Sequence, residues 1–163
     1  MIAILHNIRS LHNVGSVFRT ADAAGIKKVY LCGITPAPVD RFGRIRPQFK
    51  KISLGAEKYV EWQKVPKIEN LIQELKKEKY KIFAVEQSEK SIPYYKLKTR
   101  NAVTRHSALR VALVLGNEIK GLPEPILKKA DKILEIPMRG KKESLNVAVT
   151  FGIVVFNLVY QKL

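Results

Sequence analysis

The chain has 163 residues, the size of one domain with a hydrophobic core of its own. Hydrophobic residues make up 46% of the chain and charged residues 27%, which excludes a disordered or fibrous protein. Thirty Lys and Arg side chains against fourteen Asp and Glu give a formal net charge of +16, so the expected partner is a polyanion such as nucleic acid.

Cysteine and histidine usage and the lack of a targeting pattern indicate the compartment. The single Cys32 excludes an internal disulfide and a Cys-rich zinc site, and three scattered histidines do not indicate a metal centre. The N-terminus lacks the basic segment and long apolar run of a secretory signal. The most apolar stretch, residues 145–160, is interrupted by polar residues and is short for a membrane span. We expect a cytoplasmic protein without a membrane segment or metal, forming a single domain over residues 1–163.

In chain order, short apolar runs alternate with helical patterns. Residues 2–5 predict a strand, and apolar residues at helical spacing then predict a helix with Asn13 as its N-cap and Gly25 as its stop. The pattern continues with strands at 29–32, 81–85, 111–115 and 133–136 and with helices at 68–75 and 123–129. This alternation predicts an α/β domain whose mostly parallel sheet is flanked by helices.

The densest positive charge follows the second predicted strand, in residues 41–51. This stretch reads Arg-Phe-Gly-Arg-Ile-Arg-Pro-Gln-Phe-Lys-Lys and contains five cations and no anion. Cations interleaved with aromatic rings are typical of surfaces that hold unpaired nucleotides, so one interpretation is an RNA contact. The other is a solvated loop whose Phe42 and Phe49 cover the core. We favour the RNA contact because the charge of the whole chain points the same way.

The last predicted helix, residues 144–161, is apolar on nearly all sides. We expect one face to cover the sheet and the other to contact a second subunit, because large apolar patches are rarely left exposed. The alternative is a helix enclosed within its own domain. The first face comprises Val147, Phe151, Val154, Val155 and Leu158, and the second comprises Leu145, Val149, Ile153, Phe156 and Tyr160.

Several familiar site motifs are absent. No two of the nine glycines are separated by a single residue, so there is neither a GxGxxG dinucleotide fingerprint nor the glycine turn of Rossmann-type methyltransferases. Gly116 and Gly121 have the spacing of a phosphate loop, but the Lys-Ser/Thr that would follow is missing. There is no GxSxG elbow, and Ser144 has no obvious local base, which counts against a hydrolase.

Three polar segments stand where strands end, the position at which α/β proteins place their ligands. They are residues 7–20, 113–122 and 136–149. Each has an ordinary structural interpretation when taken singly: Asn13 as a cap, Arg19 paired with Asp22, Glu118 as a loop carboxylate and Ser144 as an N-cap.

Together, the three segments resemble the three motifs of the SpoU (TrmH) family of RNA ribose 2'-O-methyltransferases, within the SPOUT superfamily. The patterns are N-x-x-x-x-x-R-T followed by A-D-A-x-G, then L-G-N-E-x-x-G-L, then I-P-M-x-G-x-x-x-S-L-N-V. One departure is Ile119, where a small residue is common. The resemblance spans almost the whole chain, and because no appended RNA-binding domain is seen we expect a minimal catalytic domain.

The resemblance implies a fold, a cofactor and a set of site residues. Relatives carry a C-terminal deep trefoil knot, bind S-adenosylmethionine in it, and form homodimers with active sites near the interface. By motif position, the implied catalytic residues are Arg19, Asn13, Glu118, Ser144 and Asn146. The implied cofactor-binding residues are Gly116, Ile136, Met138, Ser144 and Leu145, with Gln87 on a weaker match. We assign RNA binding to Arg9, Arg41, Arg44, Arg46, Lys50 and Lys51.

The role of Arg19 has two interpretations. The family mechanism has this arginine activate the ribose hydroxyl, but a guanidinium is always protonated in proteins. The alternative is that Arg19 anchors a neighbouring RNA phosphate and stabilises the developing oxyanion.

The leading interpretation of function is methylation of a ribose 2'-hydroxyl in structured RNA. We favour tRNA, because no appended domain is seen, with rRNA as the alternative. The rivals are a catalytically silent RNA-binding or assembly factor of the same fold and a basic nucleotide-binding domain with another small ligand. The retained set of implied catalytic residues favours an active enzyme.

Overall fold

Seven strands form one parallel sheet in the computed structural model, which describes residues 1–97 and 110–160. Their order is β3-β2-β1-β6-β4-β7-β5, and every neighbouring pair runs parallel, which confirms the predicted α/β class. The strands are β1 (Ile2–His6), β2 (Lys28–Cys32), β3 (Glu61–Val65), β4 (Lys81–Val85), β5 (Ile92–Pro93), β6 (Val111–Leu115) and β7 (Lys132–Glu135).

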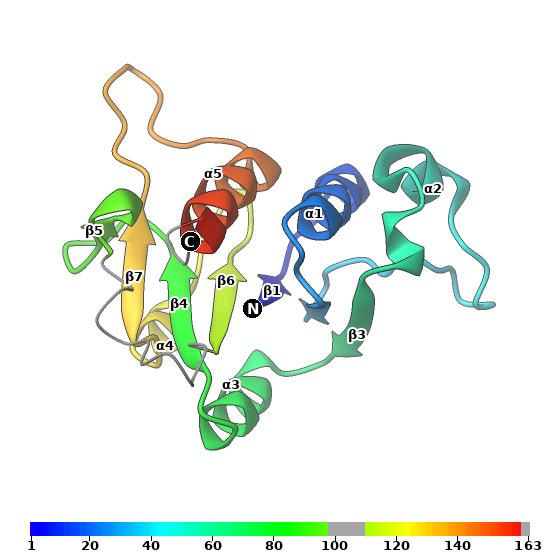
Figure 1. The fold of residues 1–163 in the computed structure, drawn as a ribbon, viewed down its shortest axis with the longest axis horizontal. Coiled ribbons are helices and arrows are strands. Elements are labelled where there is room, and N and C mark those ends of the chain that lie inside the picture. Colours follow the sequence, from blue (N-terminus) through cyan, green and yellow to red (C-terminus); the bar gives the residue numbers. More distant parts are fainter. Residues whose placement is uncertain (98–109, 161–163) are drawn as a thin grey trace.

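Helices cover both faces of the sheet (Figure 1). Side chains of α1, α2 and α5 join the core on one face, and those of α3 and α4 join the core on the other. The helices are α1 (Leu11–Ala23), α2 (Pro47–Ser53), α3 (Ile68–Lys77), α4 (Glu124–Leu127) and α5 (Val147–Tyr160), with short 3-10 helices η1 (Ala56–Lys58) and η2 (Tyr94–Lys96).

The central strands are continuous apolar runs because a parallel sheet is covered on both faces. Every residue of β6 is buried, as are the first four of β1. The edge strand β3 has no fully buried residue and reads Glu-Trp-Gln-Lys-Val, so no apolar run marks it. The strand β5 is only two residues long. The sequence pattern therefore misses both of these edge strands and finds the other five.

The predicted N-cap of the first helix is wrong. The helix begins at Leu11, and its N-cap is Ser10, whose hydroxyl accepts the Asn13 N–H at 3.2 Å. Asn13 lies within the first turn, with its side chain directed to another partner. The predicted stop is confirmed, because Gly25 takes a left-handed φ of +69° just beyond the C-cap.

The last helix begins at Val147 rather than at Ser144. The side-chain oxygen of Asn146 accepts the Ala148 N–H at 2.8 Å, so Asn146 occupies the capping position that the sequence assigned to Ser144. Residue 161, the predicted end, lies outside the described residues, and the described helix ends at Tyr160.

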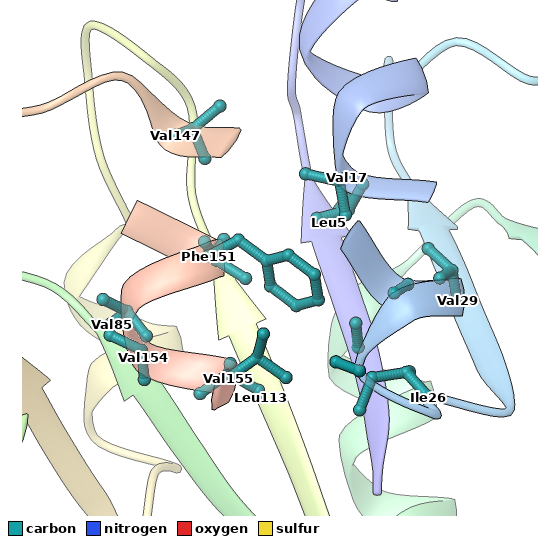
Figure 2. Close-up of a cluster of buried hydrophobic side chains, with 14 of the residues drawn as sticks. Leu5, Val17, Ile26, Val29, Val85, Leu113, Val147, Phe151, Val154 and Val155 are labelled. Carbon is teal, nitrogen blue, oxygen red and sulfur yellow. The ribbon is translucent and has the colours of Figure 1, made fainter. Parts of the chain in front are cut away.

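The two apolar faces of α5 have different environments. The face predicted to cover the sheet is buried at all five positions. Figure 2 shows Phe151 projecting from this face toward β1, with Val154 and Val155 over β4 and β6. On the other face, Val149 is 50% exposed and Tyr160 is 63% exposed. The alternative of a helix enclosed in its own domain is therefore wrong for this face.

The basic stretch is not a single loop. Residues from Pro47 onward form α2, and Phe49 is fully buried, with its ring edge-on to Phe18 at a centroid distance of 5.2 Å. Phe42 is 63% exposed. The interpretation that both phenylalanines cover the core is therefore confirmed for Phe49 and wrong for Phe42, and the RNA contact stays a prediction.

The loop between β7 and α5, residues 136–146, rises above the carboxyl ends of β4, β6 and β7 (Figure 1). The deep trefoil knot that the resemblance implies for the C-terminal part stays a prediction. Within residues 1–97 and 110–160, no helix combines the length and apolarity needed to cross a membrane.

Candidate functional site

A cavity of about 320 Å³ opens at the carboxyl ends of β4, β6 and β7. Its walls are the residues after β4, the turn after β6, the loop after β7 and the first turn of α5. The volume lies at the lower end of the range for small-molecule sites. The six residues assigned to the cofactor all line this cavity: Gln87, Gly116, Ile136, Met138, Ser144 and Leu145.

The charge of the cavity is opposite to that of the protein. Four glutamates line it, and the described part of the chain contributes no lysine, arginine or histidine to its walls. The chain as a whole carries +16. Carboxylate walls favour a cationic ligand and hydroxyl donors, and they repel phosphate. The four are Glu86, Glu118, Glu135 and Glu143.

Glu86 holds the turn after β6 and is not among the site residues predicted from the sequence. Its Oε2 accepts the Leu122 N–H at 2.8 Å, and its Oε1 accepts the Gln87 N–H at 3.0 Å. The carboxylate thereby joins the end of β4 to the end of the turn. The signal that could have identified Glu86 is its place directly after the strand at 81–85, at the carboxyl edge of the sheet.

Asn117 ties the same turn to the loop after β1. Its side-chain amide donates to the Asn7 carbonyl at 2.7 Å, while its Oδ1 accepts the N–H groups of Ile119 and Lys120. Asn117 is also not among the site residues predicted from the sequence, and its hydrogen bonds fix the shape of the turn. The turn accommodates Ile119, whose side chain is 77% exposed. The departure from the family motif at Ile119 therefore does not crowd the turn.

Gln87 positions the loop between β7 and α5. Its side-chain amide donates to the Glu143 carbonyl, which fastens the loop to the end of β4. The other backbone groups of residues 138–145 have no hydrogen-bond partner among the residues that the structure describes. The loop therefore presents unpaired N–H and C=O groups beside the cavity.

A chain of hydrogen bonds joins the three polar segments. Glu118 Oε1 accepts from the Asn13 side-chain amide at 2.9 Å, and Asn13 Oδ1 accepts from the Asn146 amide at 3.0 Å. The Glu118 carboxylate also accepts the backbone N–H groups of Arg9 and Ser10 at 3.0 and 3.1 Å. Three of the five residues assigned to catalysis thus form one network that links the loop after β1, the turn after β6 and the start of α5.

These hydrogen bonds keep Glu118 ionised. Burial by itself would raise the pKa of the Glu118 carboxyl, but the N–H groups of Arg9 and Ser10 and the Asn13 amide stabilise the carboxylate and hold its pKa below the ordinary value. Because the folded pKa is depressed, the stabilisation is fully present above the unfolded pKa near 4.5 and is lost as the pH falls through the folded pKa.

Glu118→Gln is expected to lower the free energy of unfolding by about 1–2 kcal/mol at neutral pH, because an amide replaces a carboxylate that accepts several hydrogen bonds. The difference from the wild type should shrink as the pH falls below about 4. Urea unfolding at both pH values measures it. Glu124→Gln is the control, since Glu124 is exposed and pairs, among the described residues, only with Lys128 at 4.0 Å. An equal loss of stability in Glu118→Gln at both pH values would contradict this account.

Two residues assigned to catalysis lie outside the network. Ser144 lines the cavity with its side chain exposed and caps no helix. Arg19 is exposed on α1 and does not line the cavity. The ordinary interpretation of Arg19 is wrong, because the described residues show no ion pair between Arg19 and Asp22. Within residues 1–97 and 110–160, the exposed Arg19 guanidinium on α1 has no ion pair.

The residues assigned to RNA do not line the cavity, although the backbone N–H of Arg9 donates to Glu118, which does. Arg9, Arg41, Arg44, Lys50 and Lys51 are exposed. Arg46 is half-buried, and its Nε donates to the Val39 carbonyl at 3.1 Å, so it supports the local structure. Figure 1 places residues 38–46 at the opposite end of the molecule from the loop 136–146. The structure thus brings the residues assigned to the cofactor together and sets the basic stretch at a distance from them.

Comparison with known proteins gives sequence relatives over the whole chain. It is 29% identical over 163 residues to the 23S rRNA (guanosine-2'-O-)-methyltransferase RlmB of Haemophilus ducreyi, covering 100% of this chain and 61% of the relative. It is 32% identical over 162 residues to the enzyme of the same name from Xylella fastidiosa, covering 99% of this chain and 59% of the relative. The chain therefore spans about three-fifths of the length of these two curated relatives.

Solved structures share the fold. The A. aeolicus TrmH/SpoU tRNA modifying enzyme superposes with a TM-score of 0.81 at 28% identity, over 99% of this chain and 74% of that one. The AdoMet-bound rRNA methyltransferase from Sinorhizobium meliloti gives 0.84 at 25% identity, over 99% and 56%. The model of the SpoU rRNA Methylase family matches residues 1–156. With the sheet, the cavity and the three joined segments in place, the chain belongs to the SpoU rRNA methylase family.

Proposed function

We propose that this chain transfers a methyl group from S-adenosylmethionine to a ribose 2'-hydroxyl of RNA. The observation that carries the proposal is the anionic cavity at the carboxyl edge of the sheet, in a chain of net charge +16. S-adenosylmethionine carries a sulfonium and an ammonium group, whereas RNA is a polyanion, so the cavity suits the cofactor and the outer surface suits RNA. Membership of the SpoU rRNA methylase family supports the same chemistry.

The residues of the cavity fit this cofactor. Unpaired backbone groups of residues 138–145 can pair with the edge of an adenine, and the carboxylates can accept hydrogen bonds from ribose hydroxyls. Val85, Leu115 and Ile136 supply apolar wall for a ring. A ligand rich in phosphate fits poorly beside four carboxylates, which counts against the rival nucleotide-binding domain. The AdoMet-bound relative from S. meliloti supports the same assignment.

The reaction requires the protein to hold two substrates in line and to help a hydroxyl lose its proton. Bound S-adenosylmethionine supplies a methyl group on a sulfonium leaving group. Glu118 accepts hydrogen bonds from three donors, so it acts as a positioning residue rather than as the base. Arg19 anchors a phosphate next to the target ribose and stabilises charge on the hydroxyl oxygen, and the proton leaves to water.

The relatives favour rRNA over tRNA as the substrate. The sequence-based preference for tRNA rests on the expectation that no RNA-binding domain is appended, which stays a prediction, as does the cytoplasmic location. Both curated relatives named above are 23S rRNA methyltransferases, whereas the A. aeolicus protein is a tRNA modifying enzyme. We therefore place rRNA first and tRNA second, the reverse of the order expected from the sequence.

Transfer of a radiolabelled methyl group tests the proposal. The purified chain is mixed with labelled S-adenosylmethionine and with unmodified rRNA or tRNA, and calorimetric titration measures the affinity for the cofactor. We expect incorporation into rRNA. Incorporation into tRNA alone would support tRNA as the substrate, as expected from the sequence. Binding of cofactor and RNA without methyl transfer would support the catalytically silent assembly factor. A chain that binds no S-adenosylmethionine would defeat the proposal.

We also propose that two copies associate through the exposed face of α5. Leu145 and Val149 are 41% and 50% exposed, and Tyr160, at the end of the helix, stacks on Phe156 at a centroid distance of 6.1 Å. An apolar stripe of this length on one helix is typical of a subunit interface. Association through α5 would also bring the start of this helix, which lines the cavity, close to the second copy.

Val149→Asp is expected to convert the dimer to a monomer and to lower methyl transfer at least tenfold, because a carboxylate would be buried in an apolar contact. An acidic residue in the first turn of α5 suits the helix dipole, so the fold should survive. Ile34→Asp is the matched control, since Ile34 is 65% exposed and far from α5 in sequence. Sedimentation equilibrium measures the mass. If the Val149→Asp variant remains a dimer, the interface does not involve this face of α5.

Removing cations from the basic stretch is expected to weaken RNA binding and to flatten its salt dependence. With Arg44, Lys50 and Lys51 changed to Ala, the slope of log K against log salt should fall by about 2–3, because each phosphate contact contributes about 0.7–0.9. The affinity for S-adenosylmethionine should not change. The control removes Lys76 and Lys77 of α3 and its N-cap residue Lys67, on the other face of the sheet. An equal slope in the two triple variants would contradict the assignment.

A further inference from the structure

Residues 38–46 form a small hairpin before α2. Val39 and Ile45 pair through an antiparallel bridge, which closes the base of the hairpin. Arg46 fastens the two sides, since its backbone N–H donates to the Pro38 carbonyl at 2.9 Å and its Nε donates to the Val39 carbonyl at 3.1 Å. Beyond Pro38, which is buried at its base, the hairpin is therefore held in shape by its own contacts.

Asp40 fixes the tip of this hairpin. Its Oδ1 accepts the N–H groups of Phe42 at 2.8 Å and Arg44 at 3.0 Å, and its own N–H donates to the Arg44 carbonyl at 2.9 Å. Gly43 takes the left-handed φ of +77° that this turn requires. A tip that is already ordered loses little conformational entropy when a ligand binds.

Phe42 stands at this tip with its ring in solvent. Its side chain is 63% exposed, and two guanidinium groups lie against the ring, Arg41 at 4.7 Å and Arg44 at 5.1 Å from the ring centroid. The only anion of the hairpin, Asp40, is committed to backbone N–H groups. The tip thus combines an exposed aromatic face with two cations that no described carboxylate pairs.

We infer that this hairpin binds an unpaired nucleotide of the RNA substrate, with the base stacked on Phe42 and the adjoining phosphates held by Arg41 and Arg44. This inference rests on the proposed function and adds that the hairpin recognises unpaired nucleotides of the RNA substrate. A base stacks on an aromatic ring or on a guanidinium plane, and both surfaces are present here. A base within a duplex offers no free face, so the hairpin selects single-stranded nucleotides.

The position of the hairpin makes it a recognition element separate from the reaction. It lies beyond α1 and α2, at the opposite end of the molecule from the loop 136–146 (Figure 1), and none of its residues lines the cavity. RNA that contacts both regions must extend along the molecule or reach the cavity of a second copy. Phe42 is therefore expected to affect the affinity for RNA and the KM for RNA, and to leave the affinity for S-adenosylmethionine unchanged.

Two RNA probes test the inference: an oligouridylate of about ten nucleotides and a blunt RNA duplex of about ten base pairs. Phe42→Leu keeps an apolar side chain but removes the π face, and we expect it to weaken binding of the oligouridylate about tenfold while changing duplex binding less than about twofold. Tyr59→Leu is the matched control, because Tyr59 is 76% exposed and lies outside the hairpin. It should bind both probes as the wild type does.

Phe42→Trp supplies a direct signature of stacking. Its indole fluorescence, measured as the difference from the wild type with its native Trp62, should be quenched by the oligouridylate and not by the duplex. Unchanged affinity of Phe42→Leu for the oligouridylate would overturn the inference, as would an equal loss for both probes. A change in the sedimentation mass of Phe42→Leu would overturn it too, by showing that the ring contacts protein.

The two proposals fail in different ways. A wild-type chain that binds the oligouridylate through Phe42 but transfers no methyl group would defeat the proposed function and leave the hairpin inference standing. A chain that methylates RNA equally well with Phe42 or Leu at this position would defeat only the hairpin inference.

Discussion

Arg19→Ala is expected to slow methyl transfer by about 100- to 1,000-fold, the usual effect of removing a group that stabilises a developing oxyanion. The dissociation constant for S-adenosylmethionine should change less than about twofold, because Arg19 does not line the cavity. The fold should be unaffected, since the side chain is exposed and has no ion pair within the described residues. Single-turnover kinetics with saturating cofactor, together with calorimetry, separate the two effects.

Two further variants identify what Arg19 does. Arg19→Lys keeps the charge but loses the planar fork, so we expect part of the rate to return with an increased KM for RNA. Lys27→Ala removes an exposed cation just beyond α1 and should leave the rate unchanged. Loss of cofactor binding in Arg19→Ala would contradict the assigned role, and a wild-type rate in that variant would remove Arg19 from the reaction.

Gly116→Ala is expected to weaken S-adenosylmethionine binding by more than about tenfold and to lower the free energy of unfolding by about 1–3 kcal/mol. A Cβ at this position would lie 2.5 Å from the Gly121 carbonyl carbon and 2.6 Å from the Leu122 nitrogen. Both neighbours are backbone atoms that cannot rotate away, so the turn itself must move. Because Gly116 lines the cavity, the movement changes the shape of the site.

Gly140→Ala is the matched control for this prediction. Gly140 lies in the loop beside the cavity, has no positive φ, and would place a Cβ with nothing within 4 Å. We expect its stability to stay within about 0.5 kcal/mol of the wild type and its affinity for the cofactor to be unchanged. Calorimetry and urea unfolding measure both variants. An equal loss of cofactor affinity in Gly116→Ala and Gly140→Ala would show that the loop that contains Gly140, rather than the tight turn at Gly116, determines the affinity.

The strands that contain apolar runs could be predicted from the sequence. The sequence predicts β1, β2, β4, β6 and β7, because each contains an apolar run bounded by glycine or polar residues, although Leu134 is the one buried residue of β7. The edge strand β3 was missed because its pairing with β2 uses backbone groups and its side chains are largely exposed. The strand order could not be predicted, since it depends on contacts between distant segments.

The cavity could be predicted from motif position, because three segments that are far apart in sequence each follow a strand of one parallel sheet. Glu118 and Asn13 are 105 residues apart and lie within 2.9 Å of each other. The hydrogen bond that joins them could not be predicted from the sequence. A side chain such as Asn13 serves equally well as a cap or as a link in a network, and only the fold decides between them.

The missed residues act through the backbone of their partners. Glu86 and Asn117 bind N–H and C=O groups of nearby turns, and nothing in a sequence marks which backbone groups lack a partner. The same limit explains the basic stretch. Phe42 and Phe49 are seven residues apart and chemically identical, yet the start of α2 buries one and leaves the other at a hairpin tip.

The central claim is that the acceptor is the ribose 2'-hydroxyl of RNA. Mass spectrometry of nucleosides from rRNA methylated by the purified chain tests it most directly, because a methyl group on ribose and one on a base give different fragments. We predict that the added mass stays with the sugar and appears at one nucleotide of rRNA, and that Arg19→Ala loses it. A methyl group on a base, or none with the wild-type chain and saturating S-adenosylmethionine, would contradict the claim.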